Sequence, residues 1–210
     1  NDIRIVAPDN ASIEKSIKDF IPALMEEPKV MSRLAHLSFH SYGGYYPGLK
    51  EFILRSPYSE SDYWVTEWNA WCNGCDDGIV GEYNYDFARK CVTFLIEFLK
   101  NDASAAIFWE AYDSYYEHHA PSLFSYWGML AYEPDSKTYR PRKNFYAIQQ
   151  VSKFVPPGAR RIQSSDPGDS LTTVSFYDSL SNSVTLVGVS RQNHPVNLTV
   201  SLVGLPALDS

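Results

Sequence analysis

The stretch Tyr63-Trp64-Val65-Thr66-Glu67 decides the fold, because it is a short apolar run that ends in a carboxylate. We interpret it as a largely buried β-strand, and other short apolar runs, read as strands in the same way, occur at residues 3–7, 36–40 and 105–109. A polar loop and then a helical pattern follow each strand, with helices expected at 12–25, 49–56, 87–98 and 144–152. Strand and helix therefore alternate four times.

This alternation predicts a parallel sheet of four βα units, which is half of an eight-unit barrel. After Pro156-Pro157-Gly158, apolar and polar residues alternate at 171–177, 183–189 and 196–203, as in antiparallel strands. We expect an α/β fold in which residues 1–154 form the second half of a (β/α)8 TIM barrel and residues 155–210 form part of an antiparallel β-sandwich. A flavodoxin-like sheet is the alternative, but Pro8-Asp9-Asn10-Ala11 offers no phosphate-binding turn.

Composition narrows the class of function. The chain has 210 residues, of which 44% are hydrophobic and 20% charged, with a net charge of −7. No run of Lys or Arg could neutralise several phosphates, so we expect no nucleic-acid partner. No apolar stretch reaches the roughly 20 residues of a membrane span, so we expect no membrane partner. The N-terminus has neither Met nor a signal pattern, and we expect the chain to be cut from a longer protein.

The candidate site follows from the places where the four strands end. In a barrel the active site lies at the C-terminal ends of the strands. The residues expected there are Asp9, His40, Tyr42, Glu67, Trp68, Trp109 and Glu110. Carboxylates, a histidine and aromatic rings at one rim suit the cleavage of glycosidic bonds. A carboxylate such as Glu67 is costly at the end of a buried strand, so it is either functional or part of a structural ion pair.

A family resemblance adds to this interpretation. It is carried by Trp64-Val65-Thr66-Glu67-Trp68, by His40-Ser41-Tyr42 and by Phe108-Trp109-Glu110. These motifs, with the helix Asn144-Phe145-Tyr146-Ala147-Ile148-Gln149-Gln150 and the segment around Pro157-Gly158-Ala159-Arg160-Arg161-Ile162, resemble the C-terminal half of a clan A glycoside hydrolase, most similar to family 30. The resemblance implies a barrel with a side β-sandwich and a retaining mechanism.

The resemblance also implies a role for each site residue. Glu67 matches the nucleophile, His40 and Tyr42 match residues that flank and orient it, and Trp109 matches the aromatic floor of the sugar site. Trp68 and Glu110 are expected to contact substrate. The family's acid/base lies in an Asn-Glu pair that this chain lacks, so we expect that group on a missing N-terminal segment or a separate chain. Glu110 is the weaker alternative, since side-chain alternation points it towards the helices if Trp109 points into the barrel.

Two other classes of function remain open. One is a carbohydrate-binding or scaffold protein that holds sugar on an aromatic rim without cleaving it. The other is a nucleotide-dependent α/β enzyme, which has only the alternating pattern in its favour. The enzyme class implied by the resemblance leads us to expect secretion, a polysaccharide or oligosaccharide substrate, and no cofactor.

The remaining polar clusters predict no metal site. Cys72 and Cys75 lie in a polar loop, where a small disulfide ring is possible, and they lack the second pair that a zinc site requires. Cys91 falls on the apolar face of a helix and is expected in the core. Asp113, Glu117, His118 and His119 have no metal-ligand spacing and are expected to line a polar loop, with nearby tyrosines as sugar platforms or loop core.

Overall fold

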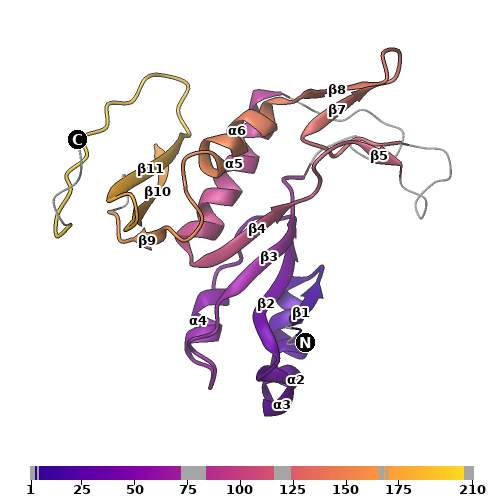
Figure 1. Cartoon of the computed structure of the whole chain (residues 1–210), viewed down its shortest axis with the longest axis vertical. Helices are drawn as coiled ribbons and strands as arrows, with labels where there is room; N and C mark the ends of the chain where they lie inside the picture. The colour runs from indigo at the N-terminus through magenta and orange to yellow at the C-terminus, as the bar shows by residue number, and fades with distance from the viewer. Residues whose placement is uncertain are drawn as a thin grey trace.

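The computed structural model describes residues 3, 5–71, 84–115, 124–165, 168 and 170–205. Its main sheet has four parallel strands in the order β1-β2-β3-β4. They are β1 (Ile5–Asn10), β2 (Leu34–Ser41), β3 (Tyr63–Trp68) and β4 (Ala103–Phe108). Sequence order equals spatial order, as in consecutive units of a barrel. The four predicted parallel strands are confirmed (Figure 1).

The helical segment after β1 begins at a polar side chain that caps it. Residues 13–25 form α1 (Ile13–Lys15), the π-helical segment η1 (Ser16–Phe20) and α2 (Ile21–Met25). The Oγ of Ser12 accepts a hydrogen bond from the Lys15 backbone N–H at 3.2 Å, so Ser12 is the N-cap. The other helices are α3 (Pro28–Met31), α4 (Leu49–Leu54) and α5 (Tyr85–Lys100).

The segment after β4 has more structure than the predicted loop. Two short strands, β5 (Ser114–Tyr115) and β6 (Phe124–Ser125), pair with each other. A hairpin of β7 (Leu130–Glu133) and β8 (Thr138–Pro141) follows, and α6 (Lys143–Ser152) comes directly after it. These strands have two to four residues, too few for an alternation pattern to show. Figure 1 shows the hairpin projecting away from the four-stranded sheet.

The C-terminal part contains an antiparallel sheet in the order β11-β10-β9. Its strands are β9 (Arg160–Ile162), β10 (Leu171–Asp178) and β11 (Ser183–Ser190), which confirms two of the three predicted antiparallel strands. The prediction of a strand at 196–203 is wrong, because this segment joins no ladder. Its alternating apolar residues are 38–88% exposed: Val196, Leu198, Val200, Leu202 and Val203. A strand needs a neighbouring edge to pair with, and alternation does not supply one.

The core is one cluster that joins the parallel sheet, its helices and the antiparallel sheet. Helix α5 buries Phe87, Cys91 and Ile96 against the parallel sheet, and β10 and β11 contribute Val174 and Val187 to the same cluster. An ionic link joins the two parts, since Asp102 at the start of β4 pairs with Lys50 of α4 and Arg161 of β9. Within the described ranges, no helix combines the length and apolar character needed to cross a membrane.

Candidate functional site

Glu67 reaches the site because β3 contains a bulge. Before it, Phe39 of β2 pairs with Val65, and after it His40 pairs with Glu67, so Thr66 is an extra residue in β3. Strict alternation from the buried Val65 would turn Glu67 towards the core. The extra residue moves Glu67 to the face that carries His40. Its side chain is 23% exposed there.

Two side chains of the β2 end hold the Glu67 carboxylate. The hydroxyl of Tyr42 donates a hydrogen bond to Oε1, and Nδ1 of His40 lies 3.3 Å from the same oxygen. These two residues are the ones expected beside Glu67, and the structure brings all three together. Because both contacts are made to Oε1, Oε2 has no hydrogen-bond partner among the described residues.

A tight turn fixes the position of Tyr42. The hydroxyl of Ser41 donates a hydrogen bond to the carbonyl of Gly44 at 2.5 Å. Gly44 has φ +87°, and a Cβ atom there would stand 2.9 Å from the ring of Phe94 on α5. Only glycine combines this backbone conformation with this close approach. The turn is therefore seated against α5 and holds the preceding tyrosine at the rim.

Asp9, at the end of β1, extends the group to a third strand. Its Oδ1 lies 3.6 Å from Nε2 of His40 and accepts a hydrogen bond from the Thr66 hydroxyl. The imidazole thus stands between two carboxylates, with one nitrogen towards Asp9 and the other towards Glu67. This arrangement limits rotation of the ring.

Trp109 and Glu110 follow β4 directly and are both partly buried. The side-chain amide of Asn69, a fully buried residue just after β3, donates to the carbonyl of Trp109 at 2.5 Å. The backbone N–H of Trp109 donates to the carbonyl of Trp68 at 2.8 Å, which ties the ends of β3 and β4 together. Glu110 Oε2 accepts a hydrogen bond from the Ser114 hydroxyl at 3.0 Å.

Trp68 lies in the core and not at the rim. It is 1% exposed, and its ring packs edge-on against Phe98 of α5 and Phe108 of β4. The bulge at Thr66 explains this, because it turns Glu67 to the site and the next residue towards the helices. We therefore leave Trp68 out of the proposed substrate site.

Asp113 forms a buried ion pair with Arg142. It is fully buried, and both of its oxygens accept hydrogen bonds from Arg142, at 2.6 and 2.7 Å. The backbone N–H groups of Gly128 and Tyr132 donate to the same carboxylate at 3.0 and 2.9 Å. A carboxylate with these four bonds is fully engaged within the protein. The other members of its predicted cluster, Glu117, His118 and His119, lie outside the described residues, as do Cys72 and Cys75.

Sequence reasoning missed Asn69 and Arg142. Asn69 follows a buried strand, and a polar residue in such a place signals a buried hydrogen bond, but its partner Trp109 lies forty residues further on. Arg142 sits between Pro141 and Lys143 and looks like part of an exposed basic stretch. Only the fold brings it to Asp113.

The rim contains one carboxylate, that of Glu67, whose Oε1 is contacted by Tyr42 and His40. The hydrogen bond from Tyr42 stabilises a negative charge on Glu67, and together with the nearby His40 ring it fixes the direction of the carboxylate. A fixed carboxylate with one oxygen unengaged can act as a nucleophile or as a base towards a bound molecule.

Comparison with solved structures places this arrangement in a known fold. An endo-β-1,6-glucanase superposes with a TM-score of 0.74 at 18% identity, over 96% of this chain and 45% of the glucanase. The catalytic domain of a family 30 xylanase C from Talaromyces cellulolyticus gives 0.63 at 17% identity, over 88% of this chain and 38% of the xylanase. A conserved exported protein from Bacteroides fragilis gives 0.62 at 15% identity, over 91% of this chain and 45% of that protein.

The chain spans less than half the length of these structures. No protein-family model matches the sequence, and no curated protein matches it. The fold is therefore assigned from structural similarity, which agrees with the resemblance seen in the sequence motifs. The chain has the fold of part of a family 30-like glycoside hydrolase.

Proposed function

We propose that this chain is the nucleophile-bearing portion of a retaining β-glycoside hydrolase that cleaves a polysaccharide or oligosaccharide. The observation that carries the proposal is the oriented Glu67 carboxylate, held through Oε1 by Tyr42 and His40 at the end of β3. The same fold occurs in glycoside hydrolases. Glu67 is the nucleophile, and Trp109 and Glu110 contact the sugar.

The proposed reaction has two displacements. In the first, Oε2 of Glu67 attacks the anomeric carbon, the bond to the leaving oxygen breaks, and a general acid gives that oxygen a proton. The product is a glycosyl ester of Glu67. In the second, water attacks the same carbon, the resulting base takes its proton, and the carboxylate of Glu67 leaves. Two inversions give net retention at the anomeric carbon.

We place the acid/base outside these 210 residues. A retaining mechanism needs a second carboxyl group about 5–5.5 Å from the nucleophile. More than half of each similar structure has no counterpart in this chain, which leaves room for the remaining strands of a barrel. The sheet itself supports such a complement, because β1 and β4 are both edge strands, with Ile5 54% and Ile107 50% exposed.

The substrate and location belong to the same proposal. One similar structure is an endo-β-1,6-glucanase and another a xylanase, which supports a β-linked polysaccharide as the substrate class. A third is an exported protein, and export suits an enzyme that meets polysaccharides outside the cell. A sugar-binding protein without hydrolysis is the rival outcome of the test.

The test is hydrolysis of a panel of β-glucans and xylans by the protein with its complete barrel, compared with its Glu67→Gln variant. We expect Glu67→Gln to lower kcat by roughly a thousandfold or more, because it removes the nucleophile. Glu51→Gln on α4, whose side chain is 65% exposed, is the matched control and should leave kcat unchanged. Full activity of Glu67→Gln would overturn the proposal, and binding without hydrolysis by the parent would favour the rival.

Native mass spectrometry tests separately whether the remaining strands of the barrel accompany this chain. We expect this 23.8 kDa chain to occur within a longer protein or together with a second polypeptide. A monodisperse monomer of this chain that unfolds cooperatively would contradict the expectation, because two open sheet edges favour association.

A further inference from the structure

Asn69 is a buried amide that stands two residues after Glu67, just beyond the end of β3. It is 0% exposed, whereas side-chain amides are mostly found at the surface. Its Nδ2 donates hydrogen bonds to the carbonyl of Trp109 at 2.5 Å and to the carbonyl of Trp127 at 3.5 Å. Its Oδ1 accepts a weak hydrogen bond from the Cys91 thiol of α5 at 3.6 Å. Both polar atoms of this side chain are therefore engaged inside the protein.

The bond to Trp109 completes a clamp on the backbone of that residue. The N–H of Trp109 donates to the carbonyl of Trp68 at 2.8 Å, and the carbonyl of Trp109 accepts from Asn69 at 2.5 Å. Trp68 and Asn69 are the two residues that directly follow Glu67 along the chain. Because one strand end carries the carboxylate and both partners of the clamp, these two hydrogen bonds fix the position of Trp109 relative to Glu67.

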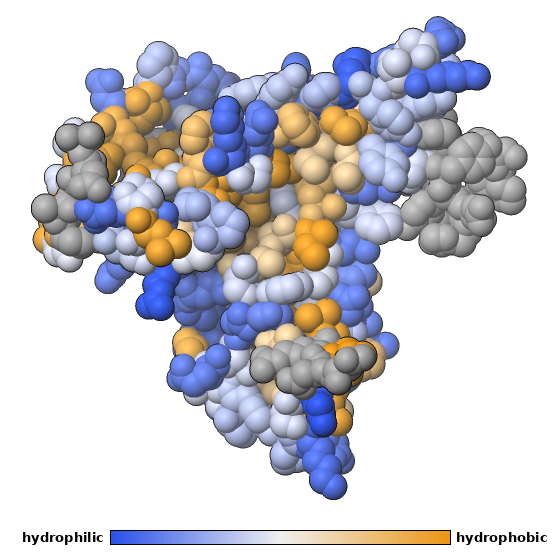
Figure 2. All heavy atoms as spheres, in the orientation of Figure 1, coloured by the Kyte–Doolittle hydropathy of each residue, from blue (hydrophilic) through white to orange (hydrophobic). Residues whose placement is uncertain are grey.

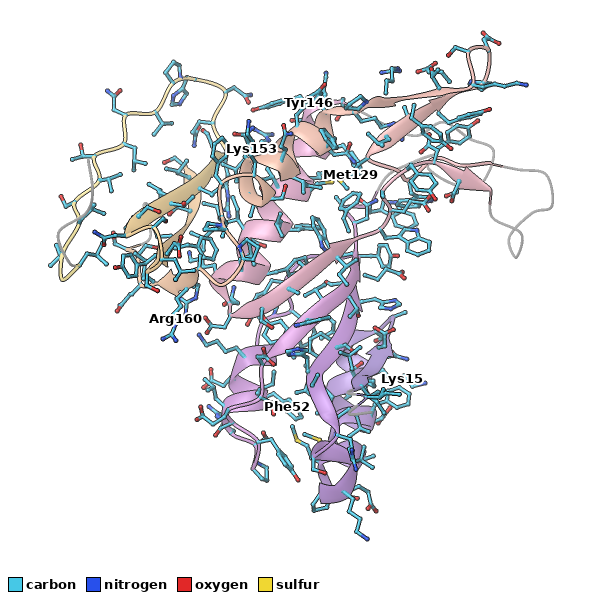
Figure 3. The ribbon with its side chains drawn as sticks, in the orientation of Figure 1. Lys15, Phe52, Met129, Tyr146, Lys153 and Arg160 are labelled. Carbon is cyan, nitrogen blue, oxygen red and sulfur yellow. The ribbon has the colours of Figure 1, made fainter. Side chains whose placement is uncertain are left out.

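A further contact comes from the segment before β7. Met129, which is labelled in Figure 3, donates its backbone N–H to the carbonyl of Glu110 at 2.9 Å. Asn69 reaches the same segment through its second, longer bond. Gly128, within this segment, donates its N–H to the buried carboxylate of Asp113 at 3.0 Å. Asn69 thus joins the end of β4 to a segment that is anchored in a buried ion pair.

These contacts suggest a role in substrate binding that does not require contact with substrate. The inference rests on the proposed function, in which Trp109 contacts the sugar. A ring that supports a sugar acts through short-range contacts, so a small displacement of the ring weakens binding. We propose that Asn69 is a positioning residue, which acts on the substrate through the placement of Trp109. Its own side chain is fully buried and does not reach a ligand.

A double-mutant cycle on sugar binding tests this role. It uses the protein with its complete barrel and the Glu67→Gln substitution, so that a β-1,6-linked gluco-oligosaccharide or a xylo-oligosaccharide is bound without being consumed. Asn69→Leu keeps most of the side-chain volume and removes both donated hydrogen bonds. We expect isothermal titration calorimetry to show about tenfold weaker binding, which corresponds to the loss of one hydrogen bond. In a Trp109→Ala background, Asn69→Leu should change the Kd by less than about twofold, because the ring that it positions is absent.

Thermal stability separates positioning from a purely structural role. Asn69→Leu should lower the Tm in both backgrounds, since the carbonyl of residue 109 loses its donor in each, whereas the Kd should change in only one. The matched control is Asn101→Leu at the end of α5, where the amide donates to the carbonyl of Glu97 at 2.8 Å. This variant loses the same type of bond and should bind the oligosaccharide as the parent does. If Asn69→Leu does not fold, the smaller change Asn69→Ser replaces it in the cycle.

Three results would overturn the proposal. They are an unchanged Kd in Asn69→Leu, an equal loss of affinity with and without the Trp109 ring, and no binding of either oligosaccharide. The cycle does not depend on hydrolysis, so its failure is distinct from failure of the proposed function. A coupled cycle in a protein whose parent cleaves no glycan would support the role of Asn69 and reject the hydrolysis.

Discussion

The Nδ1 atom of His40 lies 3.3 Å from Oε1 of Glu67. This contact exists because β3 has one more residue than β2 between two successive paired positions. Without the bulge at Thr66, alternation would place Glu67 on the buried face. The hydroxyl of the inserted Thr66 donates a hydrogen bond to Asp9 on β1. The local irregularity of β3 thus assembles groups from three strands.

Loss of the Tyr42 hydroxyl should impair the chemistry more than binding. In Tyr42→Phe, Oε1 of Glu67 loses its hydrogen-bond donor, and we expect kcat to fall by roughly 10- to 100-fold, since a hydrogen bond to a charged group contributes about 1.5–3 kcal/mol. Steady-state kinetics should show the loss in kcat and little change in KM. Tyr46→Phe, in the same loop, is the control, and an equal loss in that variant would argue against a specific role.

Breaking the buried Asp113–Arg142 pair should destabilise the fold. The two side chains are 0% and 3% exposed, so removing one leaves the other charged and buried. We expect Asp113→Asn to lower the free energy of unfolding by about 3–5 kcal/mol. Urea denaturation followed by circular dichroism measures this. The double variant Asp113→Leu with Arg142→Met should be more stable than Asp113→Asn, and a double variant that is less stable would contradict the explanation.

Asp102 should give stability a dependence on acid pH. Burial alone would raise its pKa, but hydrogen bonds from Lys50 and Arg161 outweigh burial and lower the pKa below the ordinary value of 3.8. A lowered folded-state pKa stabilises the protein above pH 3.8, and this contribution disappears as pH falls through the folded pKa. The difference in Tm between the parent and Asp102→Asn should therefore be full at neutral pH and shrink in strong acid. The exposed Asp86→Asn serves as control, and a constant difference for Asp102→Asn would refute the link.

Cys91 should be unreactive while the protein is folded. It is fully buried, and burial raises the pKa of its thiol from 9.0 to about 12. The thiolate is the reactive form, so iodoacetamide at pH 8 should alkylate Cys91 far more slowly in the native protein than in urea, as peptide mapping by mass spectrometry can follow. Because the folded pKa is raised, the protein should also lose stability between about pH 9 and pH 12. Equal alkylation rates in the two states would contradict the buried position.

The sequence was sufficient for the elements that carry a long periodic signal. The strands before Glu67, the apolar face of α5 and the antiparallel pair β10–β11 all follow from spacing alone. Short elements did not, since β9 and the hairpin β7–β8 have only three or four residues per strand. The expected strand at 196–203 shows the opposite error, in which the pattern is present and the pairing is not.

The sequence was enough to predict which residues stand at the ends of the strands and so form the candidate site. His40, Tyr42 and Glu67 follow from that rule, whereas the burial of Trp68 depends on a bulge that alternation does not reveal. Apolar side chains of the C-terminal segment, such as those of Leu198 and Val203, are exposed. Figure 2 shows apolar residues gathered over the upper part of the visible face. Whether such a side chain is covered depends on partners far along the chain or beyond it, so local sequence patterns do not specify its burial.

Covalent trapping shows whether Glu67 is a nucleophile. A dinitrophenyl 2-deoxy-2-fluoro-β-glycoside has a leaving group that needs no general acid, so it isolates the attack by the carboxylate. We predict that the protein with its complete barrel gains the mass of one fluoroglycosyl unit and that peptide mapping locates it on Glu67. A label on another carboxylate, or an unlabelled protein that still hydrolyses the natural glycan, would rule out this role for Glu67.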